Sequence, residues 1–119
     1  MAPFFERKPE IIEHLRKLDE FYCEFQKMLS QGKDNKYICQ QFKSYSGIDC
    51  SPQAGRDGVI ELTKEFYNEN TKRTESLKCE LHTKLQRKGK QKPDRIYFHP
   101  GKKGIHNGKI IVIHIGEHK

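Results

Sequence analysis

The chain has 119 residues, of which 34% are hydrophobic and 33% are charged, and its formal net charge is +7. A chain of this length can build one small core but not two, so we predict a single domain over residues 1–119. It has no apolar run long enough to span a bilayer and no apolar signal-peptide core in its opening stretch, so we expect a cytoplasmic protein with no membrane partner. The four cysteines form no C-x-x-C pair, which disfavours a zinc site or redox motif and favours buried free thiols.

Positive charge and histidine gather in the C-terminal part of the chain. Residues 1–70 contain 10 Lys and Arg against 12 Asp and Glu, whereas residues 71–119 contain 13 against 4, together with five of the six histidines. Such a one-sided distribution is typical of a protein that binds a polyanion, although solubility alone would also explain it. Nucleic acid is the partner that we expect.

A long amphipathic helix is predicted first. Pro9 suits its first turn, and Gly32 ends it. Its apolar residues recur at spacings of four and three and form one stripe, which comprises Ile11, Leu15, Leu18, Tyr22, Phe25 and Leu29. The charged residues between them are expected to form a solvated face with no catalytic role.

Two shorter helices are predicted next. The first runs over residues 35–45 with Asp34 or Asn35 as its cap and Gly47 as its stop. Its inward residues are expected to be Ile38, Phe42 and Tyr45. The other covers about residues 57–68, with Val59, Leu62, Phe66 and Tyr67 on its core side. Residues 1–70 are therefore expected to be mainly helical, and the stretch NENTKRTES is expected to be a loop or a fraying helix end.

From Leu77 the apolar period changes to two, which predicts strands. The first covers residues 77–85 with one wet, charged face, the second covers 95–99, and the last is supplied by the apolar stretch 109–119. Together they predict a three-stranded antiparallel meander over residues 77–119. The fold class is therefore α+β, with N-terminal helices packed on a small C-terminal antiparallel sheet, and the last strand is expected to be central or well covered because it is the least polar.

Strand parity predicts which side chains share a face. If Ile96 and Phe98 face the helices, and Ile111, Ile113 and Ile115 do the same, the opposite face gathers polar groups. These groups are His82, Lys84, Arg95, Tyr97, His99, His114 and His118. They suit metal-free phosphodiester cleavage, in which a base activates the ribose 2′-hydroxyl, cations stabilise the phosphorane and an acid protonates the leaving oxygen.

Each of these residues also has a simpler interpretation. Tyr97 can be an ordinary half-buried strand aromatic, and His114 inside an apolar strand is typically a packing residue. The lysines at 90, 92, 102 and 103 can be a solvated charge run that touches backbone phosphates. A register slip of one residue would also reverse the face of any strand.

Three stretches in the C-terminal third, CELHTKL, DRIYFHPG and GKIIVIHIGEHK, resemble the last three strands of RelE/ParE-superfamily toxins, which are ribosome-dependent ribonucleases and gyrase poisons. The resemblance implies a RelE/ParE-like fold and makes Arg95 the phosphate-stabilising arginine. It also places His118 at the terminal acid or base position, Lys119 at the final position, and Glu80 and His82 on the preceding strand. The sequence departs from that family because no N-terminal strand is evident and residues 1–70 are longer and more helical.

The resemblance implies a RelE-like endoribonuclease toxin that cleaves mRNA in the ribosomal A site without a metal or other cofactor, and that is neutralised by an antitoxin protein. Its catalytic residues would be Glu80, His82, Arg95, His118 and Lys119. The polar sheet face and the basic runs supply the expected RNA-contacting residues, which are Lys84, Arg87, Lys88, Lys90, Lys92, Tyr97, His99, Lys102 and Lys103. The alternative is a non-catalytic module, either a ParE-like gyrase inhibitor or a simple RNA-binding protein. A metal protein using His99, His114 and His118 ranks low because carboxylates and paired cysteines are missing nearby.

Overall fold

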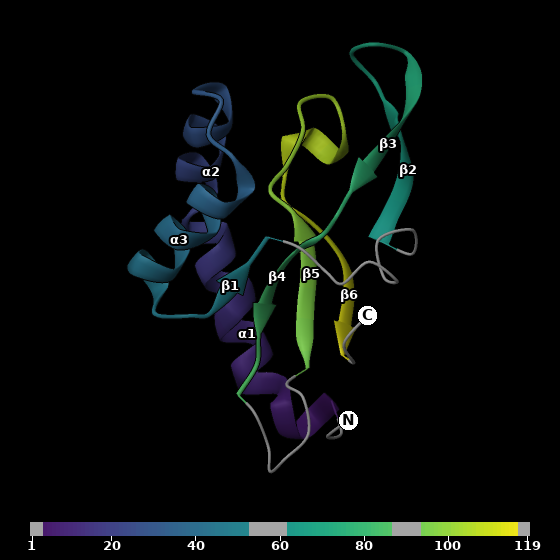
Figure 1. Cartoon of the computed structure of the whole chain (residues 1–119). Coiled ribbons are helices and arrows are strands. Elements are labelled where there is room, and N and C mark those ends of the chain that lie inside the picture. The colour runs from purple at the N-terminus through teal and green to yellow at the C-terminus, as the bar shows by residue number, and fades with distance from the viewer. Residues whose placement is uncertain (1–3, 53–61, 87–93, 117–119) are drawn as a thin grey trace.

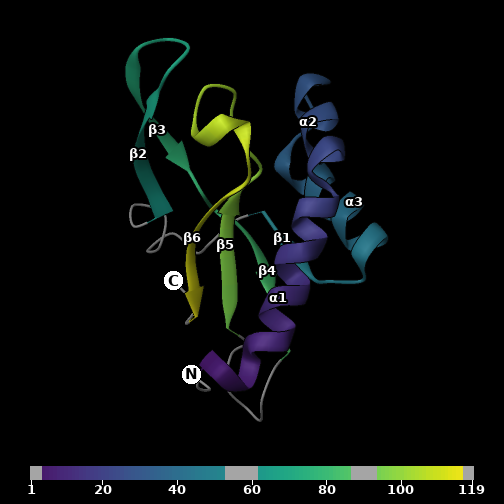
Figure 2. The same cartoon turned by 180° about the vertical axis from the view of Figure 1, so that it is seen from behind.

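The described part of the chain is an α+β fold, with helices on one side of a four-stranded sheet and a β-hairpin on the other (Figures 1 and 2). The computed structural model describes residues 4–52, 62–86 and 94–116. Its helices are α1 (Phe4–Glu20), α2 (Tyr22–Ser30) and α3 (Asn35–Ser46). Its strands are β1 (Cys50–Ser51), β2 (Thr63–Asn68), β3 (Arg73–Lys78), β4 (Leu81–Lys84), β5 (Arg95–His99) and β6 (Ile111–Gly116), and a 3₁₀ turn covers His106–Gly108.

The predicted long helix is broken at Phe21 into α1 and α2, and its buried stripe differs from the predicted one. Pro9 lies inside α1 and does not begin it, because the helix starts at Phe4. The buried positions of the two helices are Ile11, His14, Leu18, Phe21, Phe25 and Met28, whereas Leu15, Tyr22 and Leu29 are only partly buried. The buried residues also follow spacings of three and four, but every second one lies one residue before its predicted position. His14 is therefore buried in place of Leu15. Of the helices in the described ranges, none is both long and apolar enough to cross a bilayer.

Helix α3 confirms the prediction for residues 35–45. The Asp34 carboxylate accepts a hydrogen bond from the Tyr37 amide at 2.8 Å, and Gly47 ends the helix with a φ of +75°. Ile38 and Phe42 are fully buried, but Tyr45 is 49% exposed and does not point inward as predicted. Its ring stacks on Phe21 at 5.0 Å, and its hydroxyl donates to Glu20 at 2.7 Å.

The prediction of a helix over residues 57–68 is wrong over residues 63–68, which form β2, whereas residues 57–61 lie outside the described residues. β2 pairs with β3 in an antiparallel hairpin, and β3 includes residues predicted to be a loop. The side-chain oxygen of Asn68 accepts from the amides of Asn70 and Thr71, and Lys72 adopts a φ of +62°, which closes the turn. Leu62 and Phe66 are four residues apart and therefore also fit a helix, but Tyr67 is 56% exposed, as strand alternation requires.

The strand predicted over residues 77–85 is divided between two sheets. Leu77 and Lys78 end β3 in the hairpin, and Leu81–Lys84 forms β4 between β1 and β5. Between them the Cys79 amide donates to the Leu62 carbonyl at 2.9 Å. The apolar alternation continues across the crossing because Cys79 stays buried, so the pattern alone shows no break.

The meander of β4, β5 and β6 is confirmed, but its central strand is β5. The sheet order is β1-β4-β5-β6, so β6 lies at an edge of this sheet. Of the two alternatives predicted for the last strand, central or well covered, the central one is therefore wrong. Between Tyr97 and Phe98 the pairing with β6 shifts register, from His114 opposite Tyr97 to Val112 opposite Phe98.

This register shift divides the isoleucines of β6 between two layers. Ile115 packs with Ile96 and with Ile11 of α1, whereas Ile111 and Ile113 pack with Leu77 of the hairpin. The prediction that all three isoleucines face the helices is therefore wrong. β6 is apolar because it contributes to both layers, even though one of its edges carries no strand within the described residues.

His14 joins the helical layer to the sheet. It is 5% exposed, and its Nδ1 lies 2.8 Å from the Thr83 hydroxyl of β4. Burial lowers the pKa of His14 from its ordinary value, although the carboxylates of Glu10 and Glu13 act in the opposite direction. The folded chain therefore holds this imidazole neutral more strongly than the unfolded chain does.

We predict that the folded chain loses stability in mildly acidic solution because of His14. Its pKa in the unfolded chain is about 6.5 and is lower in the folded chain, so its contribution is complete above about pH 6.5 and is lost as the pH falls towards the folded value. The free energy of unfolding in urea should fall less between pH 7.5 and pH 5.0 for His14→Gln than for the wild type. An equal fall in the free energy of unfolding for both proteins would contradict the role given to His14.

Candidate functional site

The sheet register aligns the polar residues of three strands in two adjacent rows. Lys84, Arg95 and Gly116 lie opposite one another in the first row, and His82, Tyr97 and His114 do so in the second. Residues two apart along a strand share a face, so the two rows form one surface. Ile96 and Phe98 pack towards the helices, which confirms that this polar surface is on the opposite side of the sheet, as the parity predicted.

Tyr97 is the centre of this surface. It is fully buried, its ring centroid lies 4.9 Å from that of His82 and 5.9 Å from that of His114, and Leu62 and Ile113 pack against it. The Arg95 guanidinium donates from Nη1 to the Tyr97 hydroxyl at 3.3 Å. Tyr97 therefore positions the charged end of Arg95, and it cannot stack on an RNA base while it is covered.

His82 is 1% exposed, and its Nδ1 lies 3.1 Å from the Glu80 carbonyl oxygen. Glu80 itself is half-buried in the crossing between β3 and β4. The wet face predicted for residues 77–85 is thus wrong at His82, because the hairpin side of the sheet is covered by a second apolar layer. His114 remains half-buried and is more accessible than His82.

Two cations face each other in the first row. Lys84 and Arg95 are direct cross-strand partners, and both are half-buried. Like charges in such a position repel each other. Within the described residues neither side chain has an ion-pair partner, and the buried Nε of Arg95 has no hydrogen-bond partner. An anion placed against the accessible part of this pair would offset the repulsion by supplying the opposite charge.

Two of the predicted RNA-contacting lysines lie away from this pair. β5 begins at Arg95 and ends at His99, and the loop containing Lys102 and Lys103 follows its far end. Lys102 forms an ion pair with Glu75, and both lysines are exposed. The structure therefore does not bring these lysines to the Arg95 end of the sheet.

His99 is engaged within the same loop. Its Nδ1 accepts a hydrogen bond from the Gly101 amide at 3.0 Å. Burial, followed by the charge of Lys102, lowers the pKa of His99 and favours its neutral form. It shares the polar face but shapes the turn after β5. Six other predicted site residues lie outside the described residues, namely Arg87, Lys88, Lys90, Lys92, His118 and Lys119.

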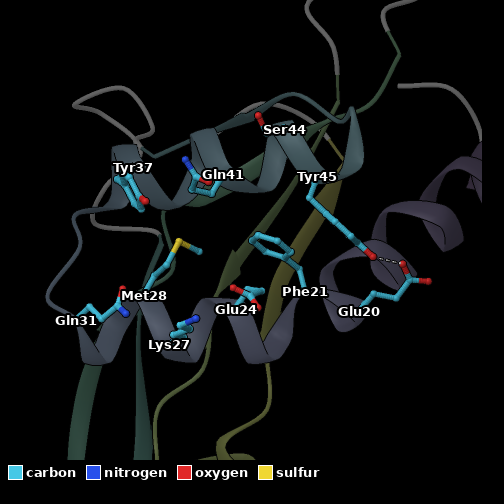
Figure 3. Close-up of a pocket in the computed structure, with 10 residues that line it drawn as sticks. All are labelled: Glu20, Phe21, Glu24, Lys27, Met28, Gln31, Tyr37, Gln41, Ser44 and Tyr45. Carbon is cyan, nitrogen blue, oxygen red and sulfur yellow. Dashed lines mark hydrogen bonds between the residues drawn. The ribbon is translucent and has the colours of Figure 1, made fainter.

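A separate groove of about 750 Å³ lies between α2 and α3 (Figure 3). Figure 3 shows the Tyr45 hydroxyl directed at the Glu20 carboxylate near one end of this groove. Both helices contribute to its lining, which comprises Glu20, Phe21, Glu24, Lys27, Met28, Gln31, Tyr37, Gln41, Ser44 and Tyr45. No histidine or arginine lines it, and it belongs to the helical layer, so it is not part of the polar sheet surface.

Comparisons with protein-family models, with curated proteins and with solved structures find no match. The resemblance to RelE/ParE toxins therefore depends on the three C-terminal sequence stretches alone. Within residues 8–52, 62–86 and 94–116, no three His, Cys, Asp or Glu side chains are grouped to hold a metal ion. The chemistry available on the described surface is that of Arg95, Lys84 and the imidazoles.

We predict that inorganic phosphate stabilises the wild type through the Lys84–Arg95 pair. In phosphate-free buffer, Lys84→Gln should raise the free energy of unfolding by about 0.2–1 kcal/mol because it removes the like-charge pair. Added phosphate should raise the melting temperature of the wild type more than that of Lys84→Gln or Arg95→Gln. Lys36→Gln makes the same change in net charge at an exposed residue of α3, outside the polar sheet surface, and it should respond to phosphate as the wild type does. Equal responses in all four proteins would contradict an anion site here.

Proposed function

We propose that the chain is a RelE-like endoribonuclease toxin that binds mRNA on the ribosome and cleaves it by metal-independent attack of a 2′-hydroxyl. The observation that carries the proposal is the half-buried Lys84–Arg95 pair, in which two cationic side chains lie directly opposite each other in the sheet and suit the negative charge of a phosphodiester. Arg95 would bind the scissile phosphate and stabilise the charge that develops on the phosphorane. Lys84 would add a second cation beside it.

The proton transfers are assigned to histidine. Gly116 is the last described residue, it lies opposite Arg95, and the sequence places His118 two residues further along the chain. In this proposal His118 acts as the acid or base, and Lys119 completes the terminal position implied by the resemblance. His82 and Tyr97 are buried, so we assign them to positioning Arg95 and His114 instead of contacting RNA.

A second candidate function has its own support. His82, proposed from the resemblance as a catalytic residue, is 1% exposed, and Tyr97 is fully buried, which leaves few proton-transfer groups accessible on the described surface. A non-catalytic module that grips RNA phosphates through Lys84 and Arg95 needs no such group. Under this alternative the protein binds RNA, or inhibits a DNA-handling enzyme as ParE-like toxins do, without cleaving anything.

Induced expression in a bacterium tests the proposal. We expect growth arrest and new mRNA 5′ ends with the wild type, and neither with Arg95→Ala or His118→Ala, whereas Lys36→Ala should behave as the wild type. Coexpression of a candidate antitoxin would then be expected to restore growth. Arrest with intact mRNA would favour the non-catalytic alternative, and unchanged cleavage by both site variants would contradict the assignment of the site.

Purified components separate binding from chemistry. His118→Ala should retain RNA affinity within about twofold but lose cleavage by about 10²–10⁴-fold, since its role is proton transfer. Arg95→Ala should lose both affinity and cleavage. The reaction should proceed in EDTA and stop when the nucleotide before the cut carries a 2′-deoxyribose, because the attacking hydroxyl is then missing. Cleavage of that 2′-deoxy substrate would contradict the mechanism.

A further inference from the structure

Two free cysteines meet where the helical layer joins the edge of the sheet. Cys39 lies on α3 and Cys50 lies on β1, and the Cys50 thiol donates to the Cys39 sulfur with the two Sγ atoms 3.3 Å apart. Cys39 is 2% exposed, whereas Cys50 is half-buried. The other two cysteines differ in their surroundings, because Cys23 is exposed on α2 and Cys79 is buried between the sheet and the hairpin.

The two sulfur atoms are already near bonding distance. Bonded sulfur atoms are separated by about 2.05 Å, so closure requires an approach of little more than about 1 Å. Only Gly47, Ile48 and Asp49 separate the end of α3 from the start of β1, so the two sulfur atoms belong to elements joined by a short connection. Within the described residues no third ligand joins the two thiols to form a metal site.

We propose that Cys39 and Cys50 are a dithiol that closes reversibly into an intramolecular disulfide on reaction with a low-molecular-weight disulfide such as oxidised glutathione. The more accessible Cys50 loses its proton, and its thiolate attacks one glutathione sulfur, which breaks the glutathione S–S bond and releases one glutathione. The Cys39 thiolate then attacks Cys50 Sγ in the mixed disulfide and releases the second glutathione. The two cysteine thiols lose two electrons, one glutathione disulfide is reduced to two thiols, and the two protons pass to the leaving thiolates.

The surroundings of Cys50 control how quickly this pair closes. The hydrogen bond to Cys39, followed by burial, raises the pKa of the Cys50 thiol, whereas the nearby Lys84 ammonium acts in the opposite direction. The reacting species is the thiolate, so closure should be slow at neutral pH and should accelerate about tenfold for each pH unit. Exposed Cys23 is the competing thiol.

Closure would tether the strand that borders the polar sheet surface. β1 pairs with β4 through Cys50 opposite Thr83 and Ser51 opposite His82, and the Lys84 amide donates to the Asp49 carbonyl at 3.0 Å. A disulfide to α3 would hold this short strand, and with it the backbone beside Lys84, against the helical layer. The proposal does not depend on the endoribonuclease function.

The full chain, fully reduced and then equilibrated with glutathione redox buffers at pH 8, tests the proposal. Mass spectrometry of the alkylated protein should show four free thiols before oxidation and two afterwards, with a peptide that links Cys39 to Cys50. Cys23→Ser should close in the same way, whereas Cys50→Ser should form no intramolecular disulfide. Oxidation confined to a mixed disulfide at Cys23, or closure between any other pair, would overturn the proposal.

Two physical readouts distinguish a native closure from a misfolded one. The oxidised wild type should melt about 5–10 °C higher than the reduced protein, since the crosslink restricts the unfolded chain. The Lys84 amide should also exchange its hydrogen more slowly in the oxidised protein. The wild-type peptide map decides the case even if Cys50→Ser does not fold. A disulfide-linked product with a lower melting temperature would overturn the proposal, because it would show that the native fold does not hold the two sulfur atoms in position.

Discussion

Strand β5 is covered on both faces, and the rest of the structure depends on that double burial. Ile96 and Phe98 are fully buried against α1 and α2, and Tyr97 between them is fully buried on the opposite side. A chain in which only 34% of residues are hydrophobic achieves this with helices on one face of β5, and with Leu62 and Ile113 packed against Tyr97 on the other. Each apolar residue of β5 therefore serves as a contact between layers, which is why substitutions in this strand should disturb the whole fold.

The same arrangement determines where charge can lie. Because Tyr97 is covered, the polar surface is accessible mainly at the end of β5 where Arg95 faces Lys84. Two half-buried cations in cross-strand register oppose folding, and no described acidic side chain forms an ion pair with either of them. Unfavourable local electrostatics of this kind are typical of binding sites, where the ligand supplies the missing charge. This contrast between the cost to stability and the gain in anion binding is the physical basis of the proposed function.

Local sequence patterns predicted the elements with strong signals. Asp34 and Gly47 delimit α3 as expected, and the alternation in residues 95–99 and the apolar run after it gave β5 and β6 with the correct antiparallel pairing. The cross-strand row of His82, Tyr97 and His114 followed from parity, because the register near Tyr97 agrees with simple alternation. What parity could not show was the layer that covers this row.

The failures have a common cause in contacts between distant parts of the chain. The spacing of Leu62 and Phe66 fits both a helix and a strand, and only the pairing with β3 decides between them. The crossing at Cys79 preserves alternation while the chain changes sheets, and the register shift opposite Ile113 reverses the faces of β6 without any mark in the sequence. His14 was likewise missed, because its burial depends on Thr83, which is 69 residues away.

We infer that the Lys84–Arg95 pair binds the phosphate of a nucleic acid. The most direct measurement is an NMR titration that follows the Arg95 Nε–H signal while inorganic phosphate, and then a short RNA, is added to the folded protein. We expect a saturable shift of this signal with both ligands, because it belongs to the guanidinium that lies beside Lys84. A signal that does not move while other basic residues respond would contradict the claim and would place the polyanion site elsewhere on the chain.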